Sequence, residues 1–167
     1  MVEVRLSRVR VDIQSSTPVV LLQETEGNRR SLPIFIGQSE AAAIATALQG
    51  LESPRPMTHD LMNNLLQALG ARLARVVVTE LRDGTYFADL RLRLGDKDIA
   101  VACRPSDGIA LAARTHSPIY VEDDLMDAEG LVVAPDEDDV SEVGEPEELV
   151  AEFSEFLDTI RPEDFSS

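Results

Sequence analysis

Residues 73–103 read LARVVVTELRDGTYFADLRLRLGDKDIAVAC, and this stretch decides the fold class. Its first third is rich in β-branched valine, Asp83-Gly84 is typical of a hairpin turn, and apolar residues then alternate with charged ones. Gly95-Asp96 marks a second turn before an apolar run at 99–103. The stretch therefore predicts three consecutive strands joined by short turns.

The N-terminal region predicts a second set of three strands. Apolar residues alternate with polar ones over 2–6, and again over 9–13 in the opposite phase. A bulge near Ser7-Arg8 keeps both apolar sets on one face of a single strand. The next two strands are expected at 18–22 and 31–36. Pro33 favours an edge position or a bulge in the last of them.

Three helices are expected between and after these strands. The first is opened by residues 37–40 and ends at Leu48; the others cover 58–69 and 106–115, before a short strand at 119–121. In the second helix one apolar stripe consists of Leu61, Leu65 and Leu69, widened by Met62 and Leu66. Strand meanders separated by helices indicate an α+β fold, with an antiparallel or mixed sheet and three helices packed on it.

The charge of the chain is unevenly distributed. The formal net charge is −16, but residues 1–120 sum to +1 and residues 121–167 to −17. We therefore expect an α+β domain at 1–131, an acidic linker at 132–145 and an acidic tail at 146–167. The tail predicts one amphipathic helix with apolar residues Leu149, Val150, Phe153, Phe156, Leu157 and Ile160. Such a helix needs a partner: its own domain, a sister subunit or another protein.

The sequence also bounds the compartment. One cysteine, Cys103, excludes an intramolecular disulfide, and its apolar neighbours favour a buried structural thiol over a nucleophile. No charged leader precedes an apolar run, and no apolar stretch is long enough to cross a membrane. We expect a soluble cytoplasmic protein without a membrane partner.

An Arg-Pro pair precedes two of the predicted helices. Arg55 stands before Thr58, and Arg104 stands before Ser106, so each arginine adjoins a hydroxyl that can cap a helix start. A helix N-terminus beside an arginine attracts anions, so these four residues are candidate phosphate contacts. The alternative interpretation is two well-capped helices whose arginines pair with nearby acids.

Polar residues at the same helix starts suggest acid–base or metal chemistry. His59, Asp60 and Asp107 are candidate catalytic residues, with His59 as general base or metal ligand. Glu40, Asp60 and Asp107 are candidate ligands for Mg²⁺ or Mn²⁺, which would activate water, provided that the fold brings them together. The helix dipole stabilises carboxylates in first turns without any such function, and this alternative stays open.

Several motifs resemble the bifunctional nuclease family. They are LPIFIGQSEA at 32–41, RPMTHDL at 55–61, DGTYFA at 83–88, RPSDGIALA at 104–112 and PIYV at 118–121. The likeness runs in order from about Val2 to Leu131. It implies an α+β fold, self-association with a dimer favoured, and the DNase and RNase activity of the plant members that named the family.

Two functions from different classes follow. The first is a metal-assisted nuclease that hydrolyses phosphodiester bonds of DNA and RNA. The second is a non-catalytic anion-binding or regulatory module that self-associates, which the acidic net charge favours because it opposes polyanion binding. Arg91 and Arg93 share a strand face, as do Arg8 and Arg10; such arginines more often form a solvated face paired with acids than a nucleic-acid surface.

Overall fold

The computed structural model describes residues 1–12, 15–51 and 53–132 of the chain. In chain order the elements are β1 (Val2–Asp12), β2 (Thr17–Glu24), β3 (Arg30–Phe35), α1 (Gln38–Leu48), α2 (Thr58–Ala68), β4 (Ala71–Arg82), β5 (Thr85–Leu94), β6 (Lys97–Cys103), α3 (Pro105–Thr115), β7 (Ile119–Val121), α4 (Asp123–Glu129) and β8 (Leu131–Val132). The α+β class and the order of the predicted elements are confirmed.

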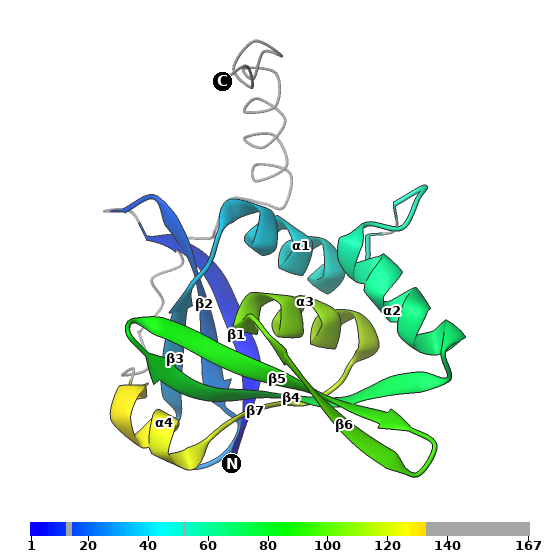
Figure 1. The fold of residues 1–167 in the computed structure, drawn as a ribbon. Helices are drawn as coiled ribbons and strands as arrows, with labels where there is room; N and C mark the ends of the chain where they lie inside the picture. Colours follow the sequence, from blue (N-terminus) through cyan, green and yellow to red (C-terminus); the bar gives the residue numbers. More distant parts are fainter. Residues whose placement is uncertain (13–14, 52, 133–167) are drawn as a thin grey trace. The chain divides into compact units, whose positions relative to one another are not determined.

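One mixed sheet contains all eight strands, in the order β6-β5-β4-β7-β1-β2-β3-β8. Neighbouring strands are antiparallel except for β4 and β7, which are parallel. The two predicted meanders, β1-β2-β3 and β4-β5-β6, are therefore joined side by side through the short strand β7 (Figure 1).

The bulge in the first strand lies where the sequence predicts it. The register of β1 against β2 shifts between Leu6 and Arg8, so that Leu6 pairs with Leu22 and Val9 with Val20. Both pairs thus point toward the core, although the apolar phase of the strand changes between them.

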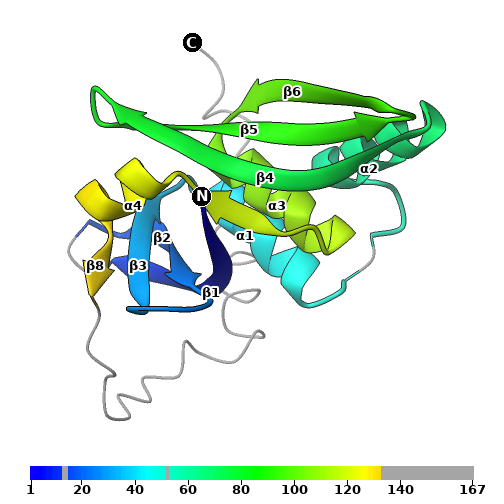
Figure 2. The same cartoon turned by 90° about the horizontal axis from the view of Figure 1, so that it is seen from below.

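Helices α1, α2 and α3 lie on one side of strands β4, β5 and β6, and the two views agree on this (Figures 1 and 2). Helix α3 is the central one: it contacts α1, α2, β4 and β5. The core between helices and sheet includes the fully buried side chains of Leu22, Leu32, Ile44, Val76, Val78, Ile109 and Leu111.

Two short elements correct the expected count, because four helices, and not three, pack on the sheet in the part of the chain that the structure describes. Helix α4 follows β7, and β8 then pairs with β3 at Arg30 and Ser31. Helix α4 has seven residues, of which only Leu125 and Met126 are buried, so its sequence shows no helical period. Its acidic residues are typical of a surface loop. Because β8 is so short, Pro33 lies beyond its pairing, at an open edge of the described sheet.

Helix α2 packs through only part of its apolar stripe. Met62 and Leu66 contact the core, while Leu61, Leu65 and Leu69 are 50, 53 and 72% exposed. The residues that the pattern makes central to the stripe therefore face outward. Single exposed leucines are ordinary, but three on one helix face form an apolar surface.

The compact unit of the fold is Met1–Val133. The predicted linker and tail fall, apart from Val132 in β8, outside the described residues, so their boundaries and the amphipathic helix stay predictions.

Candidate functional site

The guanidinium of Arg104 joins the starts of two helices. Its Nη1 donates to Glu40 Oε1 of α1 at 2.8 Å, and its Nε and Nη2 donate to the two carboxylate oxygens of Asp107 in α3, at 2.8 and 3.1 Å. These bonds leave two of the five guanidinium N–H groups unused, and 65% of the side chain is exposed. Arg104 is therefore both fixed in position and open to an incoming anion.

His59 extends the same chain of contacts to the start of α2. Its Nε2 lies 3.1 Å from Asp107 Oδ1, and the side chain is 9% exposed. An ionised carboxylate only accepts hydrogen bonds, so in the neutral ring Nε2 carries the hydrogen and Nδ1 holds a lone pair. Within the described residues Nδ1 makes no hydrogen bond. It is also not one of the solvent-inaccessible side-chain atoms that lack a hydrogen bond there. The structure thus brings Glu40, Arg104, Asp107 and His59 together.

Asp60 belongs to a separate contact. Its Oδ1 accepts from Arg114 Nε, and its Oδ2 accepts from the backbone N–H of Met57 at 2.9 Å. Arg114 Nη1 also donates to the carbonyl oxygens of Ala43 in α1 and Ala110 in α3, at 3.0 and 2.9 Å. The nearly buried side chain of Arg114 therefore links helices α1, α2 and α3. The sequence did not predict this role for Arg114. An arginine within an alanine-rich helix face is the signal that could have found it.

The surroundings keep all three acids ionised. Arg114 lowers the pKa of Asp60. The pKa of Glu40 is lowered by a hydrogen bond from the backbone N–H of Glu40 itself, and Ser39 and Arg104 lower it further. Burial alone would raise the pKa of Asp107, but the bonds from Arg104 and His59 outweigh burial and lower it.

These lowered pKa values predict loss of stability in acid. A carboxyl group with a depressed folded pKa adds stability above its unfolded pKa of about 4, and that stability disappears as the pH falls through the folded value. We expect the melting temperature, followed by circular dichroism, to fall steadily between about pH 5 and pH 2. Asp60→Asn should show a shallower fall; a slope equal to that of the unchanged chain would contradict this assignment.

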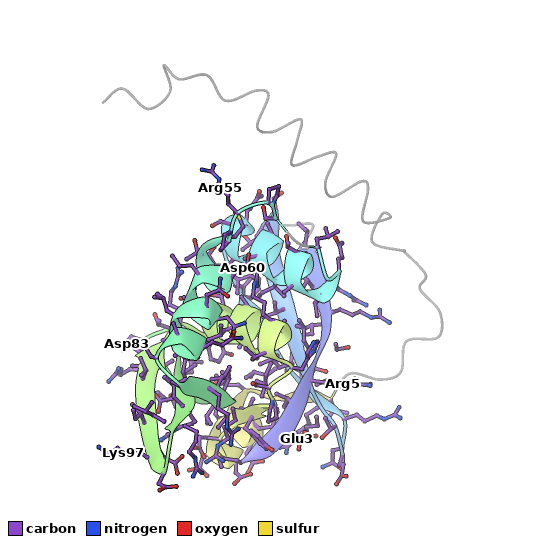
Figure 3. The ribbon with its side chains drawn as sticks, turned by 90° about the vertical axis from the view of Figure 1, so that its right-hand side faces the viewer. Glu3, Arg5, Arg55, Asp60, Asp83 and Lys97 are labelled. Atoms are coloured by element: carbon purple, nitrogen blue, oxygen red, sulfur yellow. The ribbon has the colours of Figure 1, made fainter. Side chains whose placement is uncertain are left out.

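The remaining predicted contacts are dispersed. Arg55 stands on the loop before α2 and points away from Asp60, with no ion pair among the described residues (Figure 3). Helices α2 and α3 have Met57 and Arg104 as N-caps, and the capping bond at the start of α2 comes from the carboxylate of Asp60, which accepts from the Met57 N–H. The prediction that Thr58 and Ser106 cap these helices is therefore wrong: Pro105 takes the first helical position and starts α3 one residue earlier. Ser106 is buried, at 6% exposure.

The carboxylates do not form a ready metal cage. Glu40 and Asp107 bind Arg104, whereas Asp60 binds Arg114. Within residues 1–12, 15–51 and 53–132, no three side chains of His, Cys, Asp or Glu gather as metal ligands. Cys103 is half-buried, and burial raises the pKa of its thiol to about 11, so it is a poor nucleophile at neutral pH.

Comparison with known proteins places this site in a family. The model of the bifunctional nuclease domain matches residues 20–134, which include every residue of the Arg104 and Arg114 contacts. The chain belongs to the bifunctional nuclease domain family. The motifs at 32–41, 55–61 and 104–112 that carry the resemblance contain Glu40, His59, Asp60, Arg104, Asp107 and Ala110, whereas Ala43 and Arg114 lie just after two of them. In this family member, therefore, the quoted motifs build the junction of the three helices.

The relatives are bacterial and plant proteins. An uncharacterized protein of Mycobacterium tuberculosis H37Rv is 46% identical over 167 residues, covering 100% of this chain and 99% of the relative. Bifunctional nuclease 2 of Arabidopsis thaliana is 29% identical over 117 residues, and bifunctional nuclease 1 of Oryza sativa subsp. japonica is 27% identical over 126 residues. The Arabidopsis match includes 68% of this chain and 36% of the plant protein. The rice match includes 72% of this chain and 38% of the plant protein.

The described helices are short or polar. None of them combines the length and the apolar character that crossing a bilayer requires. A cytoplasmic location stays a prediction.

Proposed function

We propose that this chain binds nucleic acid and hydrolyses its phosphodiester bonds at the junction of the three helices. The observation that carries the proposal is the contact chain Glu40–Arg104–Asp107–His59, which lies within the part of the chain that the family model matches. The plant relatives bear the name nuclease, and the bifunctional nuclease domain model matches residues 20–134 of this chain.

The roles follow from the atoms. The two unused N–H groups of Arg104 are placed to hold a phosphate oxygen and to stabilise charge that develops on it. Asp107 orients the imidazole of His59 so that Nδ1 can take a proton from the attacking water. Asp60 and Arg114 keep α2 against α3, and thereby position His59. Nucleic acid is the proposed substrate and partner, with DNA and RNA as the two candidates.

A divalent metal remains part of the proposal only as a question for experiment. The acids that the sequence suggests as ligands, Glu40, Asp60 and Asp107, are divided between two arginines. They do not fit Mg²⁺ or Mn²⁺ in this arrangement, since each would first have to leave its guanidinium. No step above depends on such an ion.

The test is a cleavage assay on highly purified full-length chain, with single-stranded DNA and RNA. Arg104→Gln should abolish most cleavage, whereas Arg82→Gln removes a similarly exposed arginine paired with Glu80 and should change little. Parallel reactions with EDTA, Mg²⁺ or Mn²⁺ decide whether metal assists. Cleavage that survives Arg104→Gln unchanged belongs to another site or to a contaminant.

The second candidate is a non-catalytic module, and one observation favours it. Both carboxylates beside Arg104 are already paired with it, and Asp60 with Arg114, as expected of contacts that only stabilise helix packing. In that case the same residues anchor the helices, and the chain binds an anion or a partner without reaction. Absence of cleavage with retained anion binding would support it.

We also propose that copies of the chain associate through the outer face of α2. This face presents Leu61, Leu65 and Leu69, and Leu48 and Leu51 at the end of α1 are exposed to a similar degree. Burial of these apolar side chains against a partner is favourable. The outer face of α2 is therefore the surface through which we expect the predicted dimer to form.

Leu61→Glu with Leu65→Glu should therefore convert the oligomer into monomer, measured by light scattering after gel filtration. The paired charges would be buried without partners in the complex, and this cost opposes association. Asn64→Glu with Gln67→Glu, on exposed polar positions of the same helix, is the control. A monomeric starting protein would refute the proposal.

A further inference from the structure

The face of the sheet turned away from α1–α3 carries four arginines in two cross-strand pairs. Arg72 of β4 lies opposite Arg93 of β5, and Arg75 lies opposite Arg91. The register shift between Leu73 and Arg75 keeps Arg72 and Arg75 on one face, because it restores the alternation after one extra residue. We call these four residues the arginine face.

Placing like charges directly opposite each other destabilises a sheet, and here it happens twice in succession. Only part of the charge is compensated: Asp89 pairs with Arg91 at 2.9 Å, and Asp98 pairs with Arg93 at 2.8 Å. In the described part of the chain, neither Arg72 nor Arg75 has an ion pair or a hydrogen bond from its side chain. The arginine face therefore carries two positive charges in excess.

The hydrogen bonds of this face are also incomplete. Nε of Arg91 and Nε of Arg93 are enclosed atoms without a hydrogen bond; Arg93 Nε lies 2.8 Å from Asp98 Oδ1, so it has an ion-pair partner, but this contact does not have the geometry of a hydrogen bond. Buried N–H groups are nearly always satisfied, so two on one face of the same strand are unusual. These two atoms are enclosed and out of a ligand's reach, so a ligand rich in acceptor oxygens would compensate the excess charge through the exposed guanidinium groups of Arg72 and Arg75.

The surface beside the arginines is open. The next strand, β6, places Ala100 next to Arg91, and Ala102 next to Asp89, and both alanines are exposed. Helices α1–α3 all lie on the other side of these strands (Figure 2). Residues 91 and 93 are two positions apart, so the two rows of guanidinium groups are about 7 Å apart. A chain of anionic groups can thus run along the face without a steric barrier.

We infer that the arginine face binds the sugar–phosphate backbone of a nucleic-acid strand. A second copy that presents its own arginine face is excluded as the occupant, since it would oppose excess positive charge with excess positive charge. The choice of nucleic acid among polyanions rests on the proposed function. The face lies across the sheet from the helix junction, so it holds the strand and does not contact the reacting phosphate.

The test uses the full-length chain and a fluorescent single-stranded DNA oligonucleotide, with anisotropy measured over a range of salt concentrations. Arg72→Gln with Arg75→Gln removes the two arginines whose loss leaves no carboxylate unpaired. Two lost phosphate contacts should reduce the slope of log K against log salt by about 1.4, and weaken binding on the order of tenfold near 0.1 M salt. Arg72→Lys with Arg75→Lys should keep the slope.

The matched control is Arg8→Gln with Arg10→Gln on β1, which removes the same charge from exposed arginines that also lack ion pairs in the described structure. Its slope should stay at the value of the unchanged chain. The inference is overturned if the original chain does not bind the oligonucleotide, if both double variants lose the same slope, or if polyglutamate of equal charge displaces the DNA equally well.

The two proposals fail separately. If DNA binding depends on Arg72 and Arg75 and no preparation cleaves DNA or RNA, the proposed nuclease activity is wrong and the binding role of the arginine face is supported. Cleavage that requires Arg104, with the Kd unchanged in the Arg72→Gln, Arg75→Gln variant, removes the arginine face and keeps the nuclease.

Discussion

Asp107→Asn should lower the rate of phosphodiester cleavage by about 10²–10⁴-fold, the usual contribution of a positioned acid–base group. The amide cannot carry the negative charge that fixes Arg104 through two bonds and selects the Nε2–H form of His59. Both the phosphate contact and the proton acceptor are then displaced, although the side chain keeps its size. The measurement is the single-turnover rate on labelled RNA and DNA.

Asp127→Asn is the matched control for this variant. Asp127 is also a helical aspartate paired with an arginine, Arg30, but it lies on α4 and is largely exposed. Its replacement should leave the cleavage rate within about twofold, because an exposed ion pair contributes little. If Asp107→Asn cleaves at the rate of this control, Asp107 has no part in the chemistry and the non-catalytic function gains the stronger support.

Arg114→Ala should destabilise the fold far more than the loss of an exposed arginine. The substitution removes bonds to Asp60, Ala43 and Ala110 in three helices, and leaves the carboxylate of Asp60 without its cation. Loss of one partner of a buried pair costs about 3–5 kcal/mol, and the partial exposure of Asp60 places the expected cost near the lower value, about 3 kcal/mol. For a domain of this size the melting temperature falls by roughly 6–12 °C.

Urea denaturation with Arg82→Ala as the comparison tests this expectation. Arg82 pairs with exposed Glu80 and lies 4.4 Å from the ring centre of Phe87, so its loss should cost about 1 kcal/mol or less. Equal losses for Arg82→Ala and Arg114→Ala would show that Arg114 does not hold the helices together. Arg114→Lys should recover part of the stability, since one ammonium can still reach the carboxylate.

The fold could be predicted from the sequence where a periodic pattern was long. Alternation in 2–13 and 73–103 indicated most of the strands of the two meanders, and the change of phase indicated the bulge after Leu6. Helix α4 escaped because seven residues are too few to display a period. The exposure of Leu61, Leu65 and Leu69 could not be predicted from the sequence. The spacing of apolar residues shows that α2 has an apolar stripe, but the positions of the neighbouring helices decide which of its residues are buried.

Part of the candidate site could also be predicted. Residue types and helix starts identified Glu40, His59, Arg104 and Asp107, and the fold brings these four together. Arg55 and Arg104 looked equivalent in the sequence because both precede proline, but only Arg104 follows directly on a strand and is held beside a second helix. Arg114 was missed because its partners come from three separate segments, and sequence spacing carries no information on such convergence.

Strand β7 has a consequence for the order in which the chain folds. Its three residues contact Val2–Val4 on one side and Val76–Val78 on the other, and no other pairing joins the two meanders within the described sheet. Each meander is made of neighbours in sequence and can close early, whereas the seam between them waits for residue 121. During synthesis, any half-sheet that closes early therefore keeps an exposed border until β7, near the end of the compact unit, has left the ribosome.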